Sequence, residues 1–279
     1  MTELPATSHT PTIGVFDSGF GGLTVLRALI ERIPQARYVF LGDTARLPYG
    51  SKSQRTIARY AVESAQFLVR EQGAQFLVIA CNTASALALD AIQEAVPVPV
   101  LGVIQPGAAA ARAASKNGDV LVIATDATVR SHAYALACQA LGLRALEKAC
   151  PLLVPLVEEG WTTHTVTEQV IEVYLSELRA EAAAAGLKPD TLVLGCTHYP
   201  LLRPLIEKAV SAGVRVIDSA ESTAQTALEQ FGAHFAPAPA GAEPELHFFA
   251  TDSIEKFERL GSSFLGRPVG KVELLDLGG

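Results

Sequence analysis

Cysteine is scarce in this chain of 279 residues, which has four, at positions 81, 138, 150 and 196. They form no CxxC pair and no closely spaced set, so the sequence predicts neither a disulfide-rich secreted domain nor a short-spaced redox pair. Free thiols are typical of a reducing compartment. We therefore expect a cytoplasmic protein whose cysteines are either packed or reactive.

Positive charge is scarce as well. The 22 Lys and Arg residues face 29 Asp and Glu residues, which gives a formal net charge of −7. Proteins that bind the phosphate backbone of nucleic acids normally carry a basic surplus, so we expect no direct nucleic-acid partner. A small anionic substrate is still compatible with this charge, because a pocket can differ from the molecule as a whole.

Long apolar runs are missing. The longest charge-free stretches, such as residues 95–111, are interrupted by proline and glycine, so none predicts an apolar helix across a membrane. Residues 1–11 lack the basic start and the apolar block of a secretory signal. We expect this segment to be a disordered leader.

Apolar side chains are abundant, at 49% of the chain, which excludes intrinsic disorder. Short β-branched runs alternate with longer helical patterns, such as those over residues 23–33 and 165–185. This alternation predicts an α/β protein with mainly parallel sheets that are covered by helices on both faces. The predicted strands are residues 12–16, 37–41, 76–80, 98–104, 119–124, 191–195 and 214–218.

Two segments of the chain repeat one pattern. FLVIACNTAS, which contains Cys81, and TLVLGCTHYP, which contains Cys196, each join a buried strand to a cysteine, a polar residue and a helix start. The two cysteines are as far apart in the chain as Asp43 and Glu158. We infer two pseudo-symmetric α/β domains with the active site in the cleft between them.

The domain boundaries follow from turn residues and from the order of elements. Proline and glycine within residues 104–107 break both the strand and the helix pattern, so we place the join between the halves there. The second domain is expected to comprise residues 105–214. The first is expected to comprise residues 12–104 and 215–279, because a strand–helix–strand pattern after the Pro/Ala-rich link at 236–244 can return to it.

Cys81 and Cys196 are the strongest candidates for catalysis. Each follows a buried strand and precedes a helix, where ligands bind to open α/β sheets and where the helix dipole favours a thiolate. A lone cysteine in an apolar run is more often a small buried hydrophobe, but the duplicated setting reverses that preference. Cys138 and Cys150 lack this setting, and we expect them to serve as packing.

Two thiols that face one cleft from opposite halves suit one type of reaction. A racemase that lacks a cofactor must remove a proton from one face of a carbon and return one to the other face, so it needs two acid–base groups. A redox pair would bring the sulfurs within bonding distance, and a single nucleophile would need no second thiol. A thiol redox protein and a non-catalytic binding module are the alternative hypotheses.

Polar residues near the two thiols support the two-base hypothesis. Asp17 and His198 could each exchange a proton with a thiol, although a helix N-cap and an ordinary loop histidine are simpler interpretations. The loop with Tyr49 and Gly50 could add backbone N–H groups and a ring to the cleft, or it could be an exposed turn. Four further residues carry hydroxyl or amide groups that could bind carboxylates: Ser18, Asn82, Thr83 and Thr197.

The sequence indicates neither a metal nor an organic cofactor. The lysines show no setting typical of pyridoxal phosphate, and the histidines show no metal-ligand spacing. GFGG at residues 19–22 is not a dinucleotide fingerprint; its glycines allow a ligand to approach the backbone or simply form a tight turn. We therefore expect an enzyme without a cofactor.

Five motifs, spread over most of the chain, are jointly very specific: GVFDSGFGGLTVL (14–26), LGDTARLPYG (41–50), ACNTASA (80–86), VPLVEEG (154–160) and GCTHYPLL (195–202). In these motifs the sequence closely resembles the glutamate racemase family within the aspartate/glutamate racemases. The resemblance implies cofactor-independent interconversion of L- and D-glutamate, which supplies D-glutamate for bacterial peptidoglycan.

The resemblance also implies roles for individual residues. Cys81 would take the proton from D-glutamate and Cys196 the proton from L-glutamate, with Asp17 and His198 assisting the thiols beside them. The implied catalytic set is Cys81, Cys196, Asp17, His198, Asp43 and Glu158. The implied substrate contacts are Asp17, Ser18, Tyr49, Gly50, Asn82, Thr83, Thr197 and His198.

Partners and specificity are implied more loosely. The family resemblance suggests a homodimer and a protein partner such as DNA gyrase, whereas no membrane partner is expected. An aspartate racemase is the nearest alternative, because one methylene group is worth only about 1–3 kcal/mol of pocket complementarity. Three positions depart from the family pattern and concern the pocket shape and the regulation: Gln105, Ala127 and Leu153.

Overall fold

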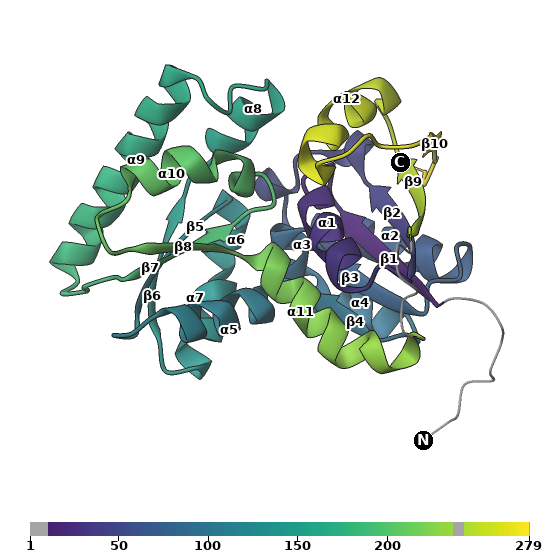
Figure 1. Ribbon diagram of the computed structural model, residues 1–279, viewed down its shortest axis with the longest axis horizontal. Coiled ribbons are helices and arrows are strands. Elements are labelled where there is room, and N and C mark those ends of the chain that lie inside the picture. The colour runs from purple at the N-terminus through teal and green to yellow at the C-terminus, as the bar shows by residue number, and fades with distance from the viewer. Residues whose placement is uncertain (1–10, 237–242, 279) are drawn as a thin grey trace.

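Two parallel sheets form the framework of the molecule (Figure 1). The computed structural model describes residues 11–236 and 243–278. Residues 1–10 of the expected leader and residues 237–242 of the expected link lie outside this part. Every strand pair in both sheets is parallel, so helices must connect the strands. The predicted α/β class is confirmed.

The first sheet has six strands in the order β10-β9-β2-β1-β3-β4. These strands are β1 (Thr12–Asp17), β2 (Arg37–Gly42), β3 (Phe76–Ile79), β4 (Val100–Gly102), β9 (Glu245–Ala250) and β10 (Val272–Leu274). One face packs against α1 (Leu23–Arg32), α11 (Ser219–Phe231) and α12 (Ile254–Leu265). The other face packs against α2 (Gln54–Arg70), α3 (Asn82–Leu87) and α4 (Leu89–Ala95). Because both faces are covered, its central strands β1, β2 and β3 are mostly apolar and buried.

The second sheet has four strands in the order β6-β5-β7-β8. They are β5 (Asp119–Ala124), β6 (Arg144–Ala149), β7 (Thr191–Gly195) and β8 (Arg215–Asp218). Helices α8 (Leu153–Glu158), α9 (Thr165–Ala184) and α10 (Arg203–Ala209) cover one face. Helices α5 (Ile104–Ala114) and α7 (Ala133–Ala140) cover the other, and the short helix α6 (Asp126–Ser131) follows β5.

The two sheets repeat one topology and one register. The order β2-β1-β3-β4 in the first sheet corresponds to β6-β5-β7-β8 in the second. Phe16 of β1 pairs with Ile79 of β3, and Ile123 of β5 pairs with Leu194 of β7. The cysteine after β3 and the cysteine after β7 each lie two residues beyond these pairs. The repeat that the sequence predicts therefore exists in the backbone, and the two cysteines occupy equivalent positions in it.

Pro106 and Gly107 do not interrupt the helix pattern, although the sequence predicts that they do, and the join between the halves near residue 104 stays a prediction. Helix α5 begins at Ile104 and runs through Pro106 and Gly107. A proline in the first turn of a helix costs little, because the N–H groups of that turn have no partner within the helix.

The polypeptide returns to the first sheet later than the sequence predicts. Residues 215–218 form β8, which pairs with β7 in the second sheet rather than with the first. Helix α11 then leads back and packs against α1 (Figure 1), and β9 and β10 extend the first sheet beside β2. Residues 215–218, which were expected in the first domain, therefore belong to the second sheet, and the division into two domains stays a prediction.

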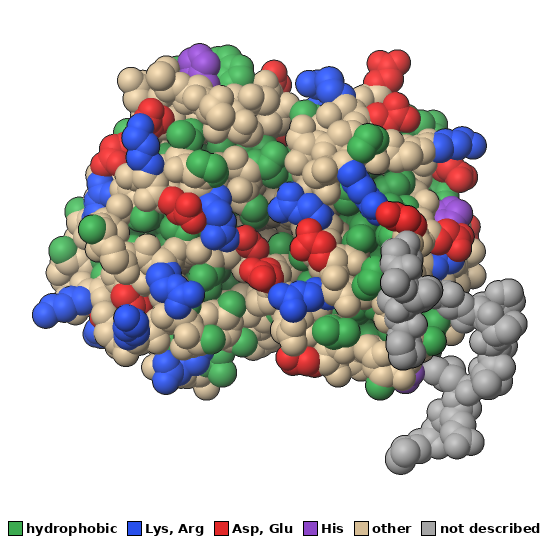
Figure 2. All heavy atoms as spheres, in the orientation of Figure 1, with side chains coloured by type: hydrophobic (Ala, Val, Ile, Leu, Met, Phe, Trp, Pro, Cys, Tyr) green, Lys and Arg blue, Asp and Glu red, His purple; other side chains and the backbone are tan. Residues whose placement is uncertain are grey.

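The surface carries charges of both signs. On the face shown in Figure 2, Lys and Arg side chains are interspersed with Asp and Glu side chains, without a large patch of either sign. In the described residues, no helix combines the length and the apolar character that crossing a membrane requires.

Candidate active site

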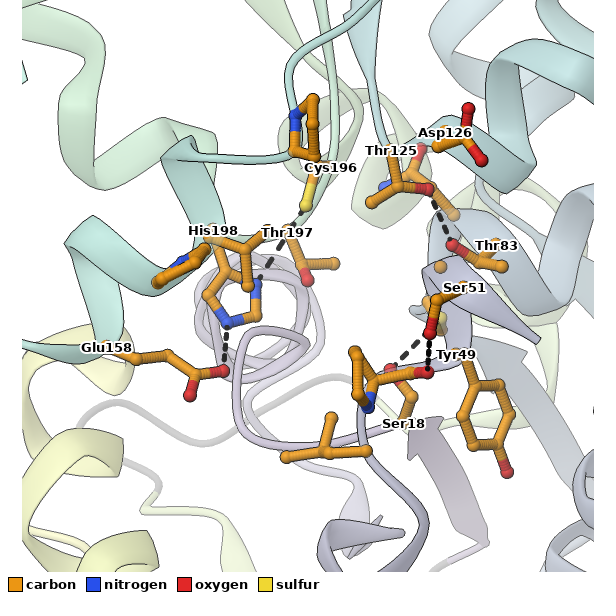
Figure 3. A pocket seen from close by; sticks show the side chains of 18 residues that line it. Ser18, Tyr49, Ser51, Thr83, Thr125, Asp126, Glu158, Cys196, Thr197 and His198 are labelled. Atoms are coloured by element: carbon orange, nitrogen blue, oxygen red, sulfur yellow. Dashed lines mark hydrogen bonds and ion pairs between the residues drawn. The ribbon is translucent and has the colours of Figure 1, made fainter. Parts of the chain in front are cut away.

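A pocket of about 530 Å³ lies between the two sheets at the carboxyl ends of their strands (Figure 3). Its walls come from the segments that follow β1, β2 and β3 of the first sheet and β5, β6 and β7 of the second. Ten of the predicted site residues line it: Ser18, Tyr49, Gly50, Cys81, Asn82, Thr83, Glu158, Cys196, Thr197 and His198. The fold thus brings both candidate thiols to one pocket, and all four cysteines are free.

Cys81 closes the start of helix α3. Its Sγ accepts a hydrogen bond from the backbone N–H of Ala84 at 3.4 Å and donates one to Ser18 Oγ at 3.4 Å. The side chain is 5% exposed, and burial together with the negative charge of Asp17 raises the pKa of the thiol to about 12. In the free protein, Cys81 therefore holds its proton at neutral pH.

Asp17 lies at the end of β1 and does not itself line the pocket. Its Oδ2 accepts a hydrogen bond from the backbone N–H of Gly19 at 2.9 Å, and its Oδ1 is buried without a partner in the described residues. Burial raises the pKa of this carboxyl group, and the charge of His198 opposes that rise. Asp17 is therefore placed to act on Cys81 through its charge.

Cys196 has a different neighbourhood, formed by a chain of polar groups (Figure 3). Its Sγ lies 3.9 Å from His198 Nδ1, and His198 Nε2 lies 3.3 Å from Glu158 Oε1. Lys256 of α12 extends this row of polar groups, since its Nζ lies 2.9 Å from Glu158 Oε2. Glu158 belongs to the second half and Lys256 to the first, so this ion pair crosses the cleft.

The charges around His198 favour its cationic form. Burial lowers the pKa of His198, but its contacts with Cys196 and Glu158 outweigh burial and raise that pKa to about 10. Burial likewise works to raise the pKa of Glu158, but its bonds to His198 and Lys256 hold that pKa below the usual value. An imidazolium therefore lies next to Cys196 at neutral pH.

Gly21 of the first half packs closely against Thr197 and His198 of the second. A Cβ atom at Gly21 would lie 2.3 Å from Thr197 Oγ1 and 2.7 Å from His198 Nδ1. At Gly22, a Cβ atom would lie 2.5 Å from that of Asp17. These glycines make room for protein side chains of the site, rather than for the approach of a ligand to the backbone.

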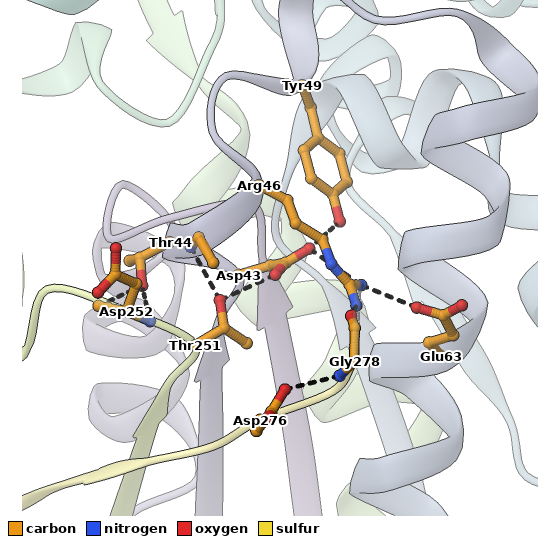
Figure 4. Close-up of polar contacts among 10 residues, drawn as sticks. Asp43, Thr44, Arg46, Tyr49, Glu63, Thr251, Asp252, Asp276 and Gly278 are labelled. Carbon is orange, nitrogen blue, oxygen red and sulfur yellow. Dashed lines mark hydrogen bonds and ion pairs between the residues drawn. The ribbon is translucent and has the colours of Figure 1, made fainter.

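Asp43 stands behind the pocket wall in a separate polar network (Figure 4). Its Oδ2 accepts a hydrogen bond from the Tyr49 hydroxyl at 2.5 Å, and its Oδ1 accepts one from Thr251 Oγ1 at 2.9 Å. Arg46 lies 3.7 Å from the same carboxylate and 2.9 Å from Glu63. The Tyr49 hydroxyl thus points toward Asp43, and the geometry favours a role for Asp43 in holding the Tyr49 loop.

Some residues of the pocket were not predicted from the sequence. Thr125 and Asp126 line it, and Thr125 Oγ1 lies 3.0 Å from Thr83 Oγ1 of the opposite half. The repeat could have indicated Thr125, because it follows β5 as Ser18 follows β1. The remaining wall comes from loops and from α8, and five of its six residues are apolar and gave no chemical reason to single them out: Leu47, Pro48, Ser51, Pro151, Val154 and Pro155.

The other two cysteines are packing residues, as predicted. Cys138 and Cys150 are fully buried in the apolar cores of the second half, and neither lines the pocket. In the part of the chain that the structure describes, no three His, Cys, Asp or Glu side chains gather as a metal site.

The three departures from the family pattern lie around the pocket rather than in it. Ala127 is buried in the helix that follows Thr125, and Leu153 is buried at the start of α8. Gln105 is exposed on α5. None of the three lines the pocket.

The fold and the site together define a class of protein: α/β enzymes with two matched sheets and one cysteine from each sheet in a shared pocket. Comparison with known proteins narrows this class. The sequence profile of the family described as Asp/Glu/Hydantoin racemase matches residues 13–227. The chain is 54% identical to the glutamate racemase of Koribacter versatilis, over 96% of this chain and 98% of that protein.

Further glutamate racemases are similar to this chain over most of its length. The glutamate racemase of Geobacter metallireducens is 46% identical over 95% of this chain and 96% of its own length. The crystal structure of glutamate racemase from Francisella tularensis in complex with D-glutamate superposes with a TM-score of 0.85 at 35% identity, covering 96% of this chain and 98% of that one. The chain therefore belongs to the Asp/Glu/hydantoin racemase family, among its glutamate racemases.

Proposed function

We propose that this protein interconverts L- and D-glutamate without a cofactor, with Cys81 and Cys196 acting as acid and base on opposite faces of the α-carbon. The observation that carries the proposal is that both thiols line one pocket from equivalent strand ends of two repeated sheets. The racemase from Francisella tularensis, which shares this fold, binds D-glutamate.

Neutral donors surround the space between the thiols. Ser18, Asn82, Thr83 and Thr197 line the pocket, and the Tyr49–Gly50 segment adds backbone to it. Hydroxyl, amide and backbone N–H groups can bind both carboxylates of glutamate, because a buried hydrogen bond to an anion is strong without a formal positive charge. These groups hold the α-carbon between the two sulfurs.

The reaction from L-glutamate begins with the proton on Cys81 and a thiolate at Cys196. Cys196 takes the α-proton, the electron pair stays on the α-carbon as a carbanion, and Cys81 donates its proton to the opposite face. The product state has the proton on Cys196 and a thiolate at Cys81, so D-glutamate reacts by the reverse path. His198, held by Glu158, stabilises negative charge at Cys196, and Asp17 keeps Cys81 in its protonated form before reaction.

The physiological setting is proposed from the family resemblance. D-Glutamate made by this protein would enter peptidoglycan synthesis in the bacterial cytoplasm, and the protein would work as a homodimer. A protein partner such as DNA gyrase stays a prediction.

The proposal is tested with purified protein in deuterium oxide, without added cofactor. Circular dichroism should show each glutamate enantiomer racemising, and proton NMR should show its α-proton exchanging for deuterium. Cys81→Ser and Cys196→Ser should each lower kcat/KM by about a thousandfold or more, because each removes one acid–base group. Cys138→Ala, which changes a cysteine outside the pocket, should keep full activity. Full racemisation by both serine variants would overturn the mechanism.

The alternatives predict different results in the same assay. An aspartate racemase would turn over aspartate faster than glutamate. A redox protein would form a disulfide between Cys81 and Cys196 during turnover, which mass spectrometry of trapped protein detects. A non-catalytic module would show no turnover at all.

A further inference from the structure

The side-chain amide of Asn82 is held at one end only. Asn82 follows Cys81, lines the pocket and is 3% exposed. Its Oδ1 accepts a hydrogen bond from the hydroxyl of Tyr134 at 2.7 Å. Its Nδ2 is buried and has no partner in the described residues. A buried amide N–H group without a partner is costly, so an acceptor on a bound ligand is the natural partner for it.

Tyr134 is a buried donor that reaches Asn82 from the other half. It belongs to α7 of the second sheet and is fully buried. Gly107 and Gly195 leave the space for its ring, since a Cβ atom at either would lie 3.0 Å from ring atoms. Burial raises the pKa of the Tyr134 hydroxyl, which therefore keeps its proton as a donor.

The direction of this hydrogen bond decides what the pocket presents to a substrate. An asparagine amide has an acceptor at one end and two donors at the other, and the two orientations have nearly the same shape. With Oδ1 on Tyr134, the N–H groups of Asn82 are left for the ligand. In the reverse orientation, Oδ1 would meet a carboxylate oxygen with like charge.

We propose that Tyr134 is a positioning residue: its hydroxyl fixes the amide of Asn82 so that the amide N–H groups bind a substrate carboxylate. Tyr134 and Asn82 come from different halves, so this orientation exists only while the halves are in contact. The inference rests on the proposed function for the identity of the carboxylate, but not for the orientation of the amide in the free protein.

The first test is Tyr134→Phe, which removes the hydroxyl and keeps the ring. The KM for both glutamate enantiomers should rise about tenfold while kcat changes less than threefold, because binding loses an oriented donor and the thiols are untouched. Tyr38→Phe is the matched control: Tyr38 is equally buried, but its hydroxyl donates to the backbone oxygens of Leu29 and Ile33. It should leave KM unchanged.

A double-mutant cycle separates positioning from a general loss of structure. In an Asn82→Ala background, Tyr134→Phe should change KM less than twofold, because the amide that it orients is gone. An undiminished tenfold effect in that background would overturn the proposal. So would a wild-type KM for Tyr134→Phe itself.

A third readout does not depend on turnover. In protein labelled with ¹⁵N at asparagine, the side-chain amide signal of Asn82 should shift in free Tyr134→Phe and stay in place in free Tyr38→Phe. An unmoved signal would overturn the proposal even if racemisation were confirmed. A moved signal in a protein that did not racemise glutamate would instead overturn the proposed function and leave the positioning role standing.

Discussion

Cys81 and Cys196 stand at equivalent positions of two repeated sheets, but their surroundings differ in charge. Cys81 meets a hydroxyl group, with the buried carboxyl of Asp17 behind it, and its pKa is raised to about 12. Cys196 meets His198, whose pKa is raised to about 10 by Cys196 and by Glu158 against the effect of burial. The two sites share the backbone positions of the thiols and differ in the polar and charged groups beside them.

This difference separates two requirements of a two-base enzyme. The matched register fixes where the two sulfurs lie, whereas the unmatched neighbours raise the pKa of Cys81 and hold a cationic His198 beside Cys196. Because the two enantiomers have equal free energy, kcat/KM must be the same in both directions whatever the neighbours are. An asymmetry between the thiols can therefore appear in isotope effects and in kcat and KM taken separately, but not in kcat/KM.

The largest predicted effect comes from forcing the two neighbourhoods apart. Gly21→Ala should lower kcat/KM about a hundredfold, because its Cβ atom would displace Thr197 and His198, and a misplacement of about 1 Å can cost that much. Steady-state kinetics of the purified variant measures this. Gly270→Ala is the control, since a Cβ atom there meets nothing within 4 Å. Equal activity of the two variants would contradict the close contact at Gly21.

The second largest effect is expected from removing the charge of Glu158, which stabilises the cationic form of His198. Glu158→Gln should lower kcat/KM about thirtyfold. It should also shift the pH profile: the His198 cation is present below its pKa of about 10 and is lost above it, so activity falls as the pH rises through that value. Without the Glu158 charge that pKa is lower, and the alkaline limb should move to lower pH. An unmoved limb would show that another group sets it.

Isotope effects then show which thiol the Glu158→Gln change affects. If it slows transfer at Cys196, the deuterium isotope effect on kcat/KM should grow for α-deuterated L-glutamate, since its label moves in the slow step. For α-deuterated D-glutamate the effect should shrink, because its label has already left to Cys81. Equal changes for both substrates would remove the proposed assignment of Cys196 to L-glutamate.

Changing the neighbour of Cys81 should lower kcat/KM less and should change the isotope effects of the two enantiomers in the opposite directions. Ser18→Ala removes the hydroxyl 3.4 Å from Cys81 Sγ and should lower kcat/KM about tenfold. Here the isotope effect should grow for D-glutamate and shrink for L-glutamate. Competition between unlabelled and α-deuterated glutamate of one enantiomer measures the isotope effect on kcat/KM for both variants. A pattern identical to that of Glu158→Gln would mean that the two neighbourhoods act on one common step.

Much of the similarity between the two sites can be predicted from the sequence, because in each half a buried apolar strand is followed by a cysteine. Three features follow from the sequence patterns: the α/β class, the equivalent positions of Cys81 and Cys196 at one pocket, and the packing role of Cys138. The polar edge strand β6 (Arg144–Ala149) was missed, because its side chains are mostly only half-buried and carry charge.

Contacts between the halves could not be predicted, because they join residues far apart in the chain. Asp43 and Glu158 have the same spacing as the two cysteines, yet Asp43 holds Tyr49 behind the wall while Glu158 lines the pocket. Spacing along the chain does not fix where a loop or a helix end turns its side chain. Lys256 lies in the C-terminal segment that the family motifs hardly cover, and only the fold brings it to Glu158.

The smallest predicted effect concerns that lysine. Lys256→Gln should lower kcat/KM only about threefold, because its ammonium group is partly exposed and screened by solvent. The difference from the wild type should shrink further in high salt, which weakens the wild-type ion pair. Lys208→Gln, which removes an exposed ion pair with Glu168 far from the pocket, should change nothing. A loss of more than twentyfold for Lys256→Gln would mean that this lysine contacts the substrate directly, and the second thiol's neighbourhood would then include a true cationic binding group.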